Sequence, residues 1–290
     1  MPDLFVEAQR ASVERRGATL AEPATFSITA SRSIVIGLPG ALLPCLVGLS
    51  EITSGTLRVA GLAPRNAIAA RRLAGALCDF KWPDDLSLRD VLLWSARVAG
   101  STKEVATKRA AFMLEALKLT PLANARASAA TPVVRRAVSI ASALATEAPY
   151  LIFEDPLQGV AESEARTFGS ALVAAIGDRG WVMVAKRFDA AHPLLSSCEH
   201  VYIFERDHFV AQGTPREFLS KATVRIQVSG DVLAFEAALS AEHVDLKKYV
   251  DGSYIIELAE KPAHTLFRIA LAVGVNIEAY EPLSIPKVAS

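Results

Sequence analysis

The feature that most constrains the fold is an apolar segment that runs from Ile34 to Leu49 and reads IVIGLPGALLPCLVGL. Its 16 residues fall short of the ~20 apolar residues that an α-helix needs to span a bilayer. Three glycines and two prolines interrupt the segment, and proline breaks the interior of a helix. Two interpretations are open: a membrane span, or a buried strand followed by a tight loop and a buried helix. The interruptions favour the second interpretation.

Composition narrows the class of protein. Apolar residues make up 51% of the 290 residues and charged residues 21%, which is typical of a globular chain with a sizeable core. The 31 basic residues balance the 31 acidic residues, so no charge excess favours nucleic acid as a partner. The three scattered cysteines form neither a disulfide framework nor a metal-ligand spacing. The first residues are charged and include no apolar run, so we expect no secretory signal. We therefore expect a cytoplasmic protein with no metal site and no nucleic-acid partner.

Strands and helices are predicted to alternate over residues 1–221, which indicates an α/β core with a mostly parallel sheet. Residues 70–130 are predicted to be mostly helical. Buried strands are predicted at Ser33–Gly37, Thr56–Val59, Tyr150–Phe153 and Trp181–Ala185, with a hairpin of Val201–Phe204 and Phe209–Ala211 and a weak edge strand near Ala24–Thr29. Helices are predicted from Pro44 to about Leu49 and at Leu88–Val98, Ala110–Leu119 and Pro132–Ala145.

The pattern changes after residue 221. Strands are predicted at Thr223–Ser229, Val244–Tyr249, Ser253–Leu258 and Ile277–Leu283, and helices at Val232–Ser240 and Ala263–Val273. The resulting order, β-α-β-β-α-β, is typical of a small ferredoxin-like α+β domain. We therefore predict a core domain of residues 1–221 and an accessory domain of residues 222–290.

Several segments of the core domain follow one another in a recognisable order. They are Gly37–Gly61, Asp84–Asp90, Arg135–Leu144, Tyr150–Pro156 and Val210–Glu217. Each is weak alone, but together, over roughly residues 20–220, they resemble the nucleotide-binding subunits of ABC transporters. The resemblance implies an ABC-type P-loop NTPase core with a helical subdomain at about residues 80–145. The C-terminal part is similar to the appendage on ATPases that serve ABC-2 type exporters.

The Walker A slot departs from the pattern that binds phosphate. A P-loop needs G-x-x-x-x-G-K-[ST], because bare N–H groups and a lysine cradle the phosphates. The slot here holds Gly37, Gly40, Ala41, Leu42, Leu43, Pro44 and Cys45. Leu42 replaces a glycine, Leu43 the lysine, and Pro44 the hydroxyl that would bind magnesium. We expect Leu42 to intrude where the backbone should approach phosphate, and the loop to be a packed apolar turn.

The resemblance places the Walker B slot at Glu154 and Asp155, in inverted order. Glu154 could still approach a metal ion, whereas the shorter Asp155 would lie farther from an attacking water. Alternatively, both carboxylates serve a buried turn. The Q-loop slot holds Cys78 or Asp79, depending on one residue of alignment, and neither is the glutamine of the family.

The two remaining motifs of the family are also altered. The signature slot holds Thr131, Pro132 and Val133, so a hydroxyl remains but both glycines are absent. The slot of the switch histidine holds Arg187, which we interpret as part of a charged surface turn that could still offer a cation. The histidines at 192, 200, 208, 243 and 264 do not cluster, and we expect them at surface or capping positions.

Three functions are open. The first is a degenerate subunit of an ABC-2 type transporter that binds membrane subunits, dimerises with itself or an active ATPase, and hydrolyses little or no ATP. It would lie on the inner face of the cell membrane and require no cofactor, although weak binding of ATP with magnesium remains possible. The second is a scaffold or regulator outside transport that reuses the fold. The third is a working ATPase with unusual chemistry.

Overall fold

The computed structural model describes residues 5–187, 192–220, 223–248, 253–258 and 264–283. The chain divides into two compact units. The first contains the described residues up to Lys186 and from His192 to Gln212, and the second contains Arg187 and the described residues from Gly213 onward. The sequence analysis places the domain boundary near residue 221, after the short helix α7 (Pro215–Ser220) that the structure groups with the second unit.

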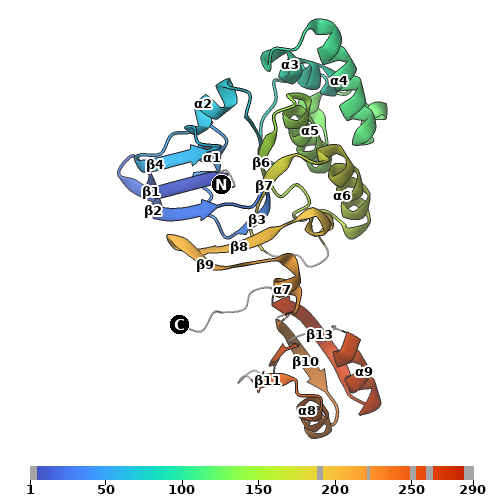
Figure 1. Ribbon diagram of the computed structural model, residues 1–290. Coiled ribbons are helices and arrows are strands. Elements are labelled where there is room, and N and C mark those ends of the chain that lie inside the picture. The colour runs from blue at the N-terminus through green and yellow to red at the C-terminus, as the bar shows by residue number, and fades with distance from the viewer. Residues whose placement is uncertain (1–4, 188–191, 221–222, 249–252, 259–263, 284–290) are drawn as a thin grey trace. The chain divides into compact units, whose positions relative to one another are not determined.

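The first unit begins with an antiparallel sheet of order β2-β1-β4 (Figure 1). Its strands are β1 (Val6–Arg15), β2 (Ala18–Ile28) and β4 (Ser54–Val59). Arg16 and Gly17 connect β1 to β2 and both have positive φ, as in the two-residue turns that match strand twist. The predicted edge strand near Ala24–Thr29 corresponds to the end of β2, which lies at the edge of this sheet. β1 and the first part of β2 were not predicted, because register shifts in the hairpin interrupt their alternation.

A second sheet of six strands has the order β5-β6-β7-β3-β8-β9. Its strands are β3 (Arg32–Ile36), β5 (Leu73–Ala76), β6 (Tyr150–Glu154), β7 (Gly180–Ala185), β8 (His200–Glu205) and β9 (His208–Gly213). β3, β5, β6, β7 and β8 are linked by parallel pairs. The carboxyl ends of β3, β6 and β7 therefore meet at one edge, which is where open parallel sheets bind ligands. The Thr25 N–H donates to Asp207 O at 2.9 Å and joins the two sheets.

The sequence missed β5, which lies inside a region predicted to be mostly helical. Its four residues, LAGA, are small and carry little preference for a strand. Gly75 is required here because an added Cβ would lie 2.4 Å from the Val47 Cβ. Close packing against that side chain, rather than local sequence preference, determines the position of this strand.

Helices cover the parallel sheet and form a separate group near α3 (Figure 1). They are α1 (Leu42–Leu46), α2 (Pro64–Ala69), α3 (Leu88–Val98), α4 (Lys103–Ala116), α5 (Pro132–Ala145) and α6 (Glu162–Ile176), with 3-10 turns at Thr120–Leu122, Ala127–Ala129 and Pro193–Ser197. α3 begins where expected because Ser87 and Asp90 form a capping box. None of the helices in the described part of the chain combines the length and apolar character needed to span a bilayer.

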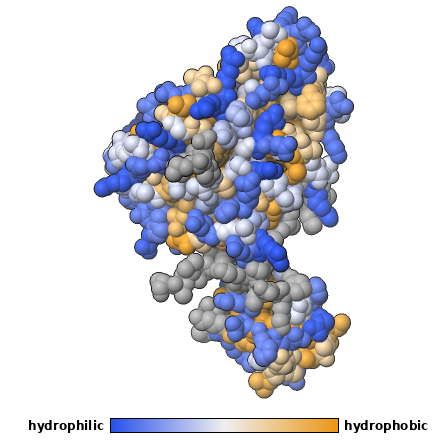
Figure 2. Space-filling model, in the orientation of Figure 1, coloured by the Kyte–Doolittle hydropathy of each residue, from blue (hydrophilic) through white to orange (hydrophobic). Residues whose placement is uncertain are grey.

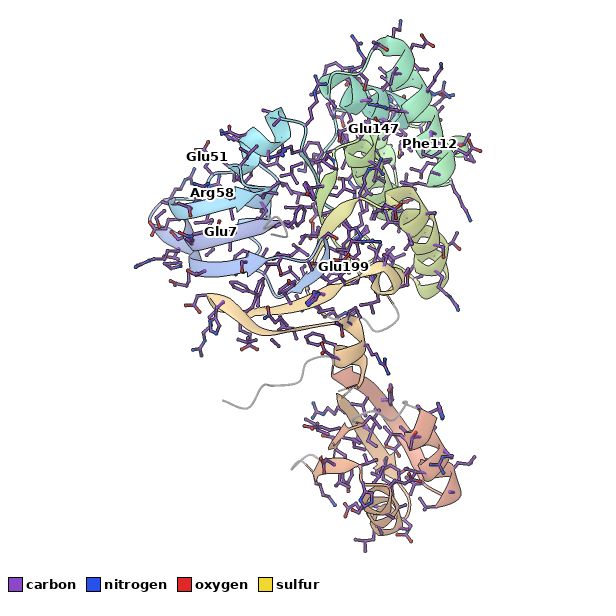
Figure 3. The ribbon with its side chains drawn as sticks, viewed as in Figure 1. Glu7, Glu51, Arg58, Phe112, Glu147 and Glu199 are labelled. Carbon is purple, nitrogen blue, oxygen red and sulfur yellow. The ribbon has the colours of Figure 1, made fainter. Side chains whose placement is uncertain are left out.

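Charged side chains join distant segments of the first unit. Glu199 accepts hydrogen bonds from the N–H and hydroxyl of Ser31 and pairs with Arg32 Nε at 3.5 Å (Figure 3). Arg109 of α4 pairs with Glu147, which follows α5. These contacts attach β3 to the segment before β8, and α4 to the end of α5.

The second unit has the element order β-α-β-β-α-β that the sequence predicts. Its elements are β10 (Thr223–Ser229), α8 (Val232–Ala241), β11 (Asp245–Lys248), β12 (Tyr254–Glu257), α9 (His264–Ala272) and β13 (Asn276–Leu283). The sheet order is β11-β12-β10-β13, and all neighbouring strands are antiparallel. Phe235, Leu239, Ile256 and Leu266 are buried in a core of its own.

Candidate functional site

The loop after β3 occupies the Walker A slot. Gly37 takes a φ of +77°, a region that glycine enters without steric cost. A Cβ at this position would lie 2.6 Å from the backbone oxygen of Phe204, so the chain requires glycine here. The Gly37 N–H donates to Ala185 O at 3.2 Å, which attaches the start of the loop to the end of β7.

The two leucines of the slot point into the protein interior. Leu42 is fully buried, and Leu43 and Cys45 lie in the same core cluster. The expected intrusion of Leu42 at the mouth of the loop is therefore wrong, since burial of its side chain in the core is more favourable. The Leu42 N–H donates to Pro39 O at 2.9 Å, so this donor is already used within the loop.

α1 starts at Leu42, two residues earlier than predicted, and ends at Leu46. Pro44 is thus the third residue of the helix, where the missing N–H has no intrahelical acceptor to satisfy. Ala41 precedes the helix and provides no side-chain cap. Gly40 is exposed, and no atom lies within 4 Å of the position of an added Cβ.

The Glu154 carboxylate at the end of β6 bonds to the Q-loop slot. Its Oε2 accepts the N–H of Cys78 at 3.0 Å. The carbonyl of the same peptide, Leu77 O, accepts the hydroxyl of Ser139 from α5 at 2.9 Å. The Cys78 thiol lies 3.3 Å from Asp155 O, and burial together with the charge of Glu154 raises the pKa of this thiol. Both polar groups of one peptide are therefore held by side chains from two separate elements.

Asp155 is buried and bonds within its own turn and to a histidine. Its Oδ1 accepts the N–H of Leu157 at 2.9 Å and lies 3.2 Å from Nε2 of His192. Nδ1 of His192 accepts the N–H of Leu194 at 3.2 Å, so Nε2 is the nitrogen that carries the proton toward Asp155. The expectation that His192 caps a helix is confirmed, whereas a surface position is wrong, since the residue is only 5% exposed.

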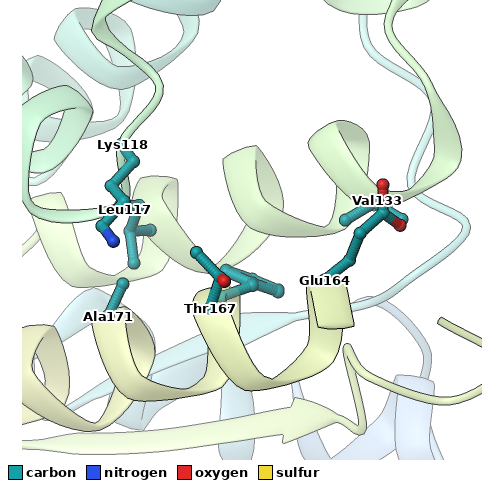
Figure 4. A pocket seen from close by; sticks show the side chains of 7 residues that line it. Leu117, Lys118, Val133, Glu164, Thr167 and Ala171 are labelled. Atoms are coloured by element: carbon teal, nitrogen blue, oxygen red, sulfur yellow. The ribbon is translucent and has the colours of Figure 1, made fainter. Parts of the chain in front are cut away.

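The signature slot forms an ordinary helix start. Thr131 is the N-cap of α5 and accepts the N–H of Val134, and Pro132 occupies the first helical position, where proline is favoured. Thr131 and Pro132 are exposed. Val133 and Glu164 lie at one end of a cavity of about 400 Å³, and Leu117 and Lys118 at the other, as Figure 4 shows.

Two slots remain, the Q-loop slot and the slot of the switch histidine. Asp79 is exposed and Cys78 contacts the Walker B slot, so the structure brings Cys78 rather than Asp79 into the site. Arg187 is exposed beyond the end of β7. Sequence reasoning missed Arg136, whose guanidinium donates to Gln158 O at 2.5 Å and to Pro156 O at 3.5 Å. The available signal was an arginine next to the apolar run of this helix, and the structure places it half-buried.

Comparison with solved structures defines the class of fold. The chain superposes on the structure of an ATP-binding subunit of an ABC transporter with a TM-score of 0.60 and 18% identity, covering 74% of this chain and 91% of that one. The chain therefore has the fold of the ATP-binding subunits of ABC transporters.

Among curated sequences, the chain is similar to the Nod factor export ATP-binding protein I of Paraburkholderia xenovorans, with 23% identity over 287 residues that cover 88% of this chain and 93% of the relative. The protein of the same name from Burkholderia orbicola is 22% identical and covers 74% of this chain and 72% of the relative. No family model matches the sequence.

The fold implies ATP and magnesium, and the residues at these positions do not fit them. Phosphate binding at a P-loop requires free N–H groups and a lysine, but the Leu42 N–H is used by Pro39 O and the slot has no lysine. Both carboxylates of the Walker B slot already accept hydrogen bonds within the protein. Among the described residues, no group of three or more His, Cys, Asp or Glu could hold a metal ion.

Proposed function

We propose that this chain is a nucleotide-binding-type subunit of an ABC-2 type transporter that contributes binding surfaces and hydrolyses little or no ATP. The observation that carries this proposal is the use of both Walker B carboxylates inside the protein, Glu154 by Cys78 N–H and Asp155 by Leu157 N–H and His192. These partners hold one oxygen of each carboxylate, and with it the orientation of the group, inside the protein. The relatives are named as export ATP-binding proteins, which supports the transporter class.

An apolar groove in the first unit supports the binding role. A cavity of about 960 Å³ lies between α3, α5 and the segment that follows β5. Trp94 and Val98 of α3 line it while 61% and 80% exposed, and Phe80 lies opposite in the same lining. Figure 2 shows apolar side chains among hydrophilic ones on the lobe that carries the helices. Exposed apolar surface of this kind is typical of a protein interface.

The indole N–H of Trp82 also supports a protein interface at the groove. Trp82 also lines the cavity and packs against Phe80 with 4.6 Å between ring centroids and a tilt of 58° between the rings. Its Nε1 is buried and has no hydrogen-bond partner among the described residues. A helix of a membrane subunit could supply both the apolar face and a carbonyl or carboxylate acceptor. We infer that the groove binds the cytoplasmic surface of such a subunit, which places this chain on the inner face of the membrane.

We further infer that residues 222–290 form a ferredoxin-like accessory domain and that the core pairs with a second ATPase-like chain, either a copy of itself or an active ATPase. The order β11-β12-β10-β13 and the two helices support the first inference. The pairing with a second ATPase-like chain is supported by the fold alone.

The purified chain tests the lack of hydrolysis. We expect ATP turnover more than about tenfold below the typical enzyme median of roughly 10 per second. Turnover near that median that falls when Glu154 is replaced by glutamine would overturn the proposal. Turnover that is unchanged by this substitution comes from a contaminating enzyme, and the rate of the variant is then the background to subtract.

Co-purification from the native host separates the transporter from the alternative, a scaffold or regulator outside transport. The transporter proposal expects a polytopic membrane subunit, with or without an intact ATPase, to accompany the chain in detergent extracts. Recovery in a complex that contains no membrane protein would favour the alternative instead.

A further inference from the structure

The peptide between Leu77 and Cys78 forms part of the floor of the apolar groove. Leu77 and Ser139 both line the groove cavity. The carbonyl of this peptide accepts the Ser139 hydroxyl, and its N–H donates to the Glu154 carboxylate. β5 ends at Ala76, so this peptide lies just beyond the residues that pair β5 with β6. At this point the side chains of Ser139 and Glu154 hold the backbone in place.

The two side chains come from two different elements. Glu154 is the last residue of β6, in the parallel sheet, and Ser139 lies in the buried stretch of α5. The Cys78 thiol adds a third contact, at 3.3 Å from Asp155 O. A displacement of the groove floor relative to either the sheet or α5 would therefore leave a polar group of this peptide without a partner, which costs about 1–3 kcal/mol when the group is buried.

We propose that Glu154 is a positioning residue that, together with Ser139, holds the groove floor in one arrangement without bound nucleotide. Its carboxylate occupies the slot where the fold would place a magnesium-associated group, and it attaches the Q-loop slot directly to the sheet. The hydrogen bonds of Glu154 and Ser139 lie within this chain and do not depend on the proposed function. Only the binding of a membrane subunit in the groove rests on that function.

A second contact limits movement on the α5 side. Arg136 precedes Ser139 on α5 by three residues, and its guanidinium donates to Gln158 O and Pro156 O in the turn after Asp155. α5 is thus attached to the end of β6 independently of the Leu77–Cys78 peptide. The groove floor, α5 and the turn after β6 are expected to behave as one rigid part.

Amide hydrogen exchange in the full-length chain tests the role of Glu154. Loss of one hydrogen bond corresponds to roughly tenfold in exchange, so we expect residues 77–79 to exchange about tenfold faster in Glu154→Ala. Glu154→Gln keeps an acceptor and should give a smaller increase. Glu51→Gln is the matched control, because Glu51 forms an exposed ion pair with Arg65 elsewhere in the first unit. Exchange in Glu154→Ala within twofold of the wild-type rate would overturn the proposal.

Two further measurements complete the test, one with milder substitutions and one with added nucleotide. If Glu154→Ala raises exchange throughout the first unit, the milder variants Ser139→Ala and Glu154→Gln are measured instead. Faster exchange confined to residues 77–79 in these variants supports the proposal, and unchanged exchange there contradicts it. Addition of magnesium and ATP to the wild-type chain is expected to leave exchange at residues 77–79 unchanged. A nucleotide-dependent change there would overturn the proposal. ATP hydrolysis without such a change would instead contradict only the proposed function.

Discussion

Asp155 and His192 form a buried pair in which Nε2 of the imidazole lies 3.2 Å from the carboxylate Oδ1. The other ring nitrogen accepts the N–H of Leu194, so the histidine has a defined tautomer and joins the turn after β6 to the 3-10 turn at Pro193–Ser197. The Asp155 carboxylate and His192 thus join two segments of the first unit that lie 37 residues apart.

Replacement of His192 by alanine should destabilise the first unit by about 2–4 kcal/mol, because it removes a cap and leaves a buried carboxylate without one of its partners. Urea unfolding followed by tryptophan fluorescence reports this unit specifically, since Trp82, Trp94 and Trp181 all belong to it. His208→Ala is the control, because its pair with Asp207 is exposed and should contribute little. Equal losses in the two variants would contradict the structural role of the buried pair.

Arg136→Ala should cost about 1–3 kcal/mol, because the carbonyls of Pro156 and Gln158 lose their donor. The neighbouring Arg135 is exposed, and Arg135→Ala should change stability by less than about 0.5 kcal/mol. Denaturant midpoints of the two variants provide the comparison. A difference below the error of the measurement would show that the contact contributes nothing to stability.

The glycines of the loop after β3 should differ in their tolerance of a side chain. Gly37→Ala combines a positive φ, which costs a non-glycine residue ~1–2 kcal/mol, with a contact of 2.6 Å to Phe204 O, so a loss above 2 kcal/mol is expected as a rough bound. Gly40→Ala meets no atom within 4 Å and should be close to neutral. Thermal unfolding of both variants measures the contrast, and similar melting temperatures would refute it.

In the second unit, Tyr254 provides a pH-dependent test. Burial, followed by the hydrogen bond to Glu236 at 2.6 Å, raises the pKa of the phenol above its ordinary value of 10. A raised pKa means that the stabilisation is fully present below pH 10 and is lost as the pH rises through the folded-state value. Burial also raises the pKa of Tyr280. Absorbance titration of the tyrosinates should therefore lose one of its late components in Tyr254→Phe, which retains the ring. An unchanged late component would assign it to another tyrosine.

Two aromatic residues of similar exposure test the binding groove. Trp94 is 61% exposed and lines the groove, whereas Phe112 of α4 is 60% exposed and lies outside its lining (Figure 3). Trp94→Ala should reduce the membrane subunit recovered by co-purification at least about tenfold, as expected for an aromatic anchor worth about 2 kcal/mol. Phe112→Ala should leave recovery unchanged. Equal recovery with both variants would argue against the groove as the docking surface.

The sequence predicts elements whose signals are local. α3, α5 and β10 have the predicted bounds, because a capping box, a proline at the first helical position and strict alternation mark them. β1 and the first part of β2 were missed because bulges interrupt their alternation, and β5 because its small residues follow packing against Val47.

The site is harder to predict, because its contacts join residues far apart in the chain. The resemblance identified Glu154 and Asp155 as an inverted Walker B slot, and left open whether they approach a metal or serve a turn. Their partners, Cys78 and His192, lie 76 and 37 residues away. Only the approach of β5 to β6, and of the 3-10 turn to the end of β6, decides which groups the carboxylates meet.

The hydrogen bond between Thr25 and Asp207 has a consequence for how this chain can associate. β2 lies at the edge of its sheet, and an edge strand with a regular row of free backbone groups can add a strand from another molecule. In β2, Pro23 has no N–H, and the N–H of Thr25 already donates to Asp207 O. The row is interrupted at both positions, so a second molecule that pairs with this edge finds a shorter run of free backbone groups than the length of β2 offers.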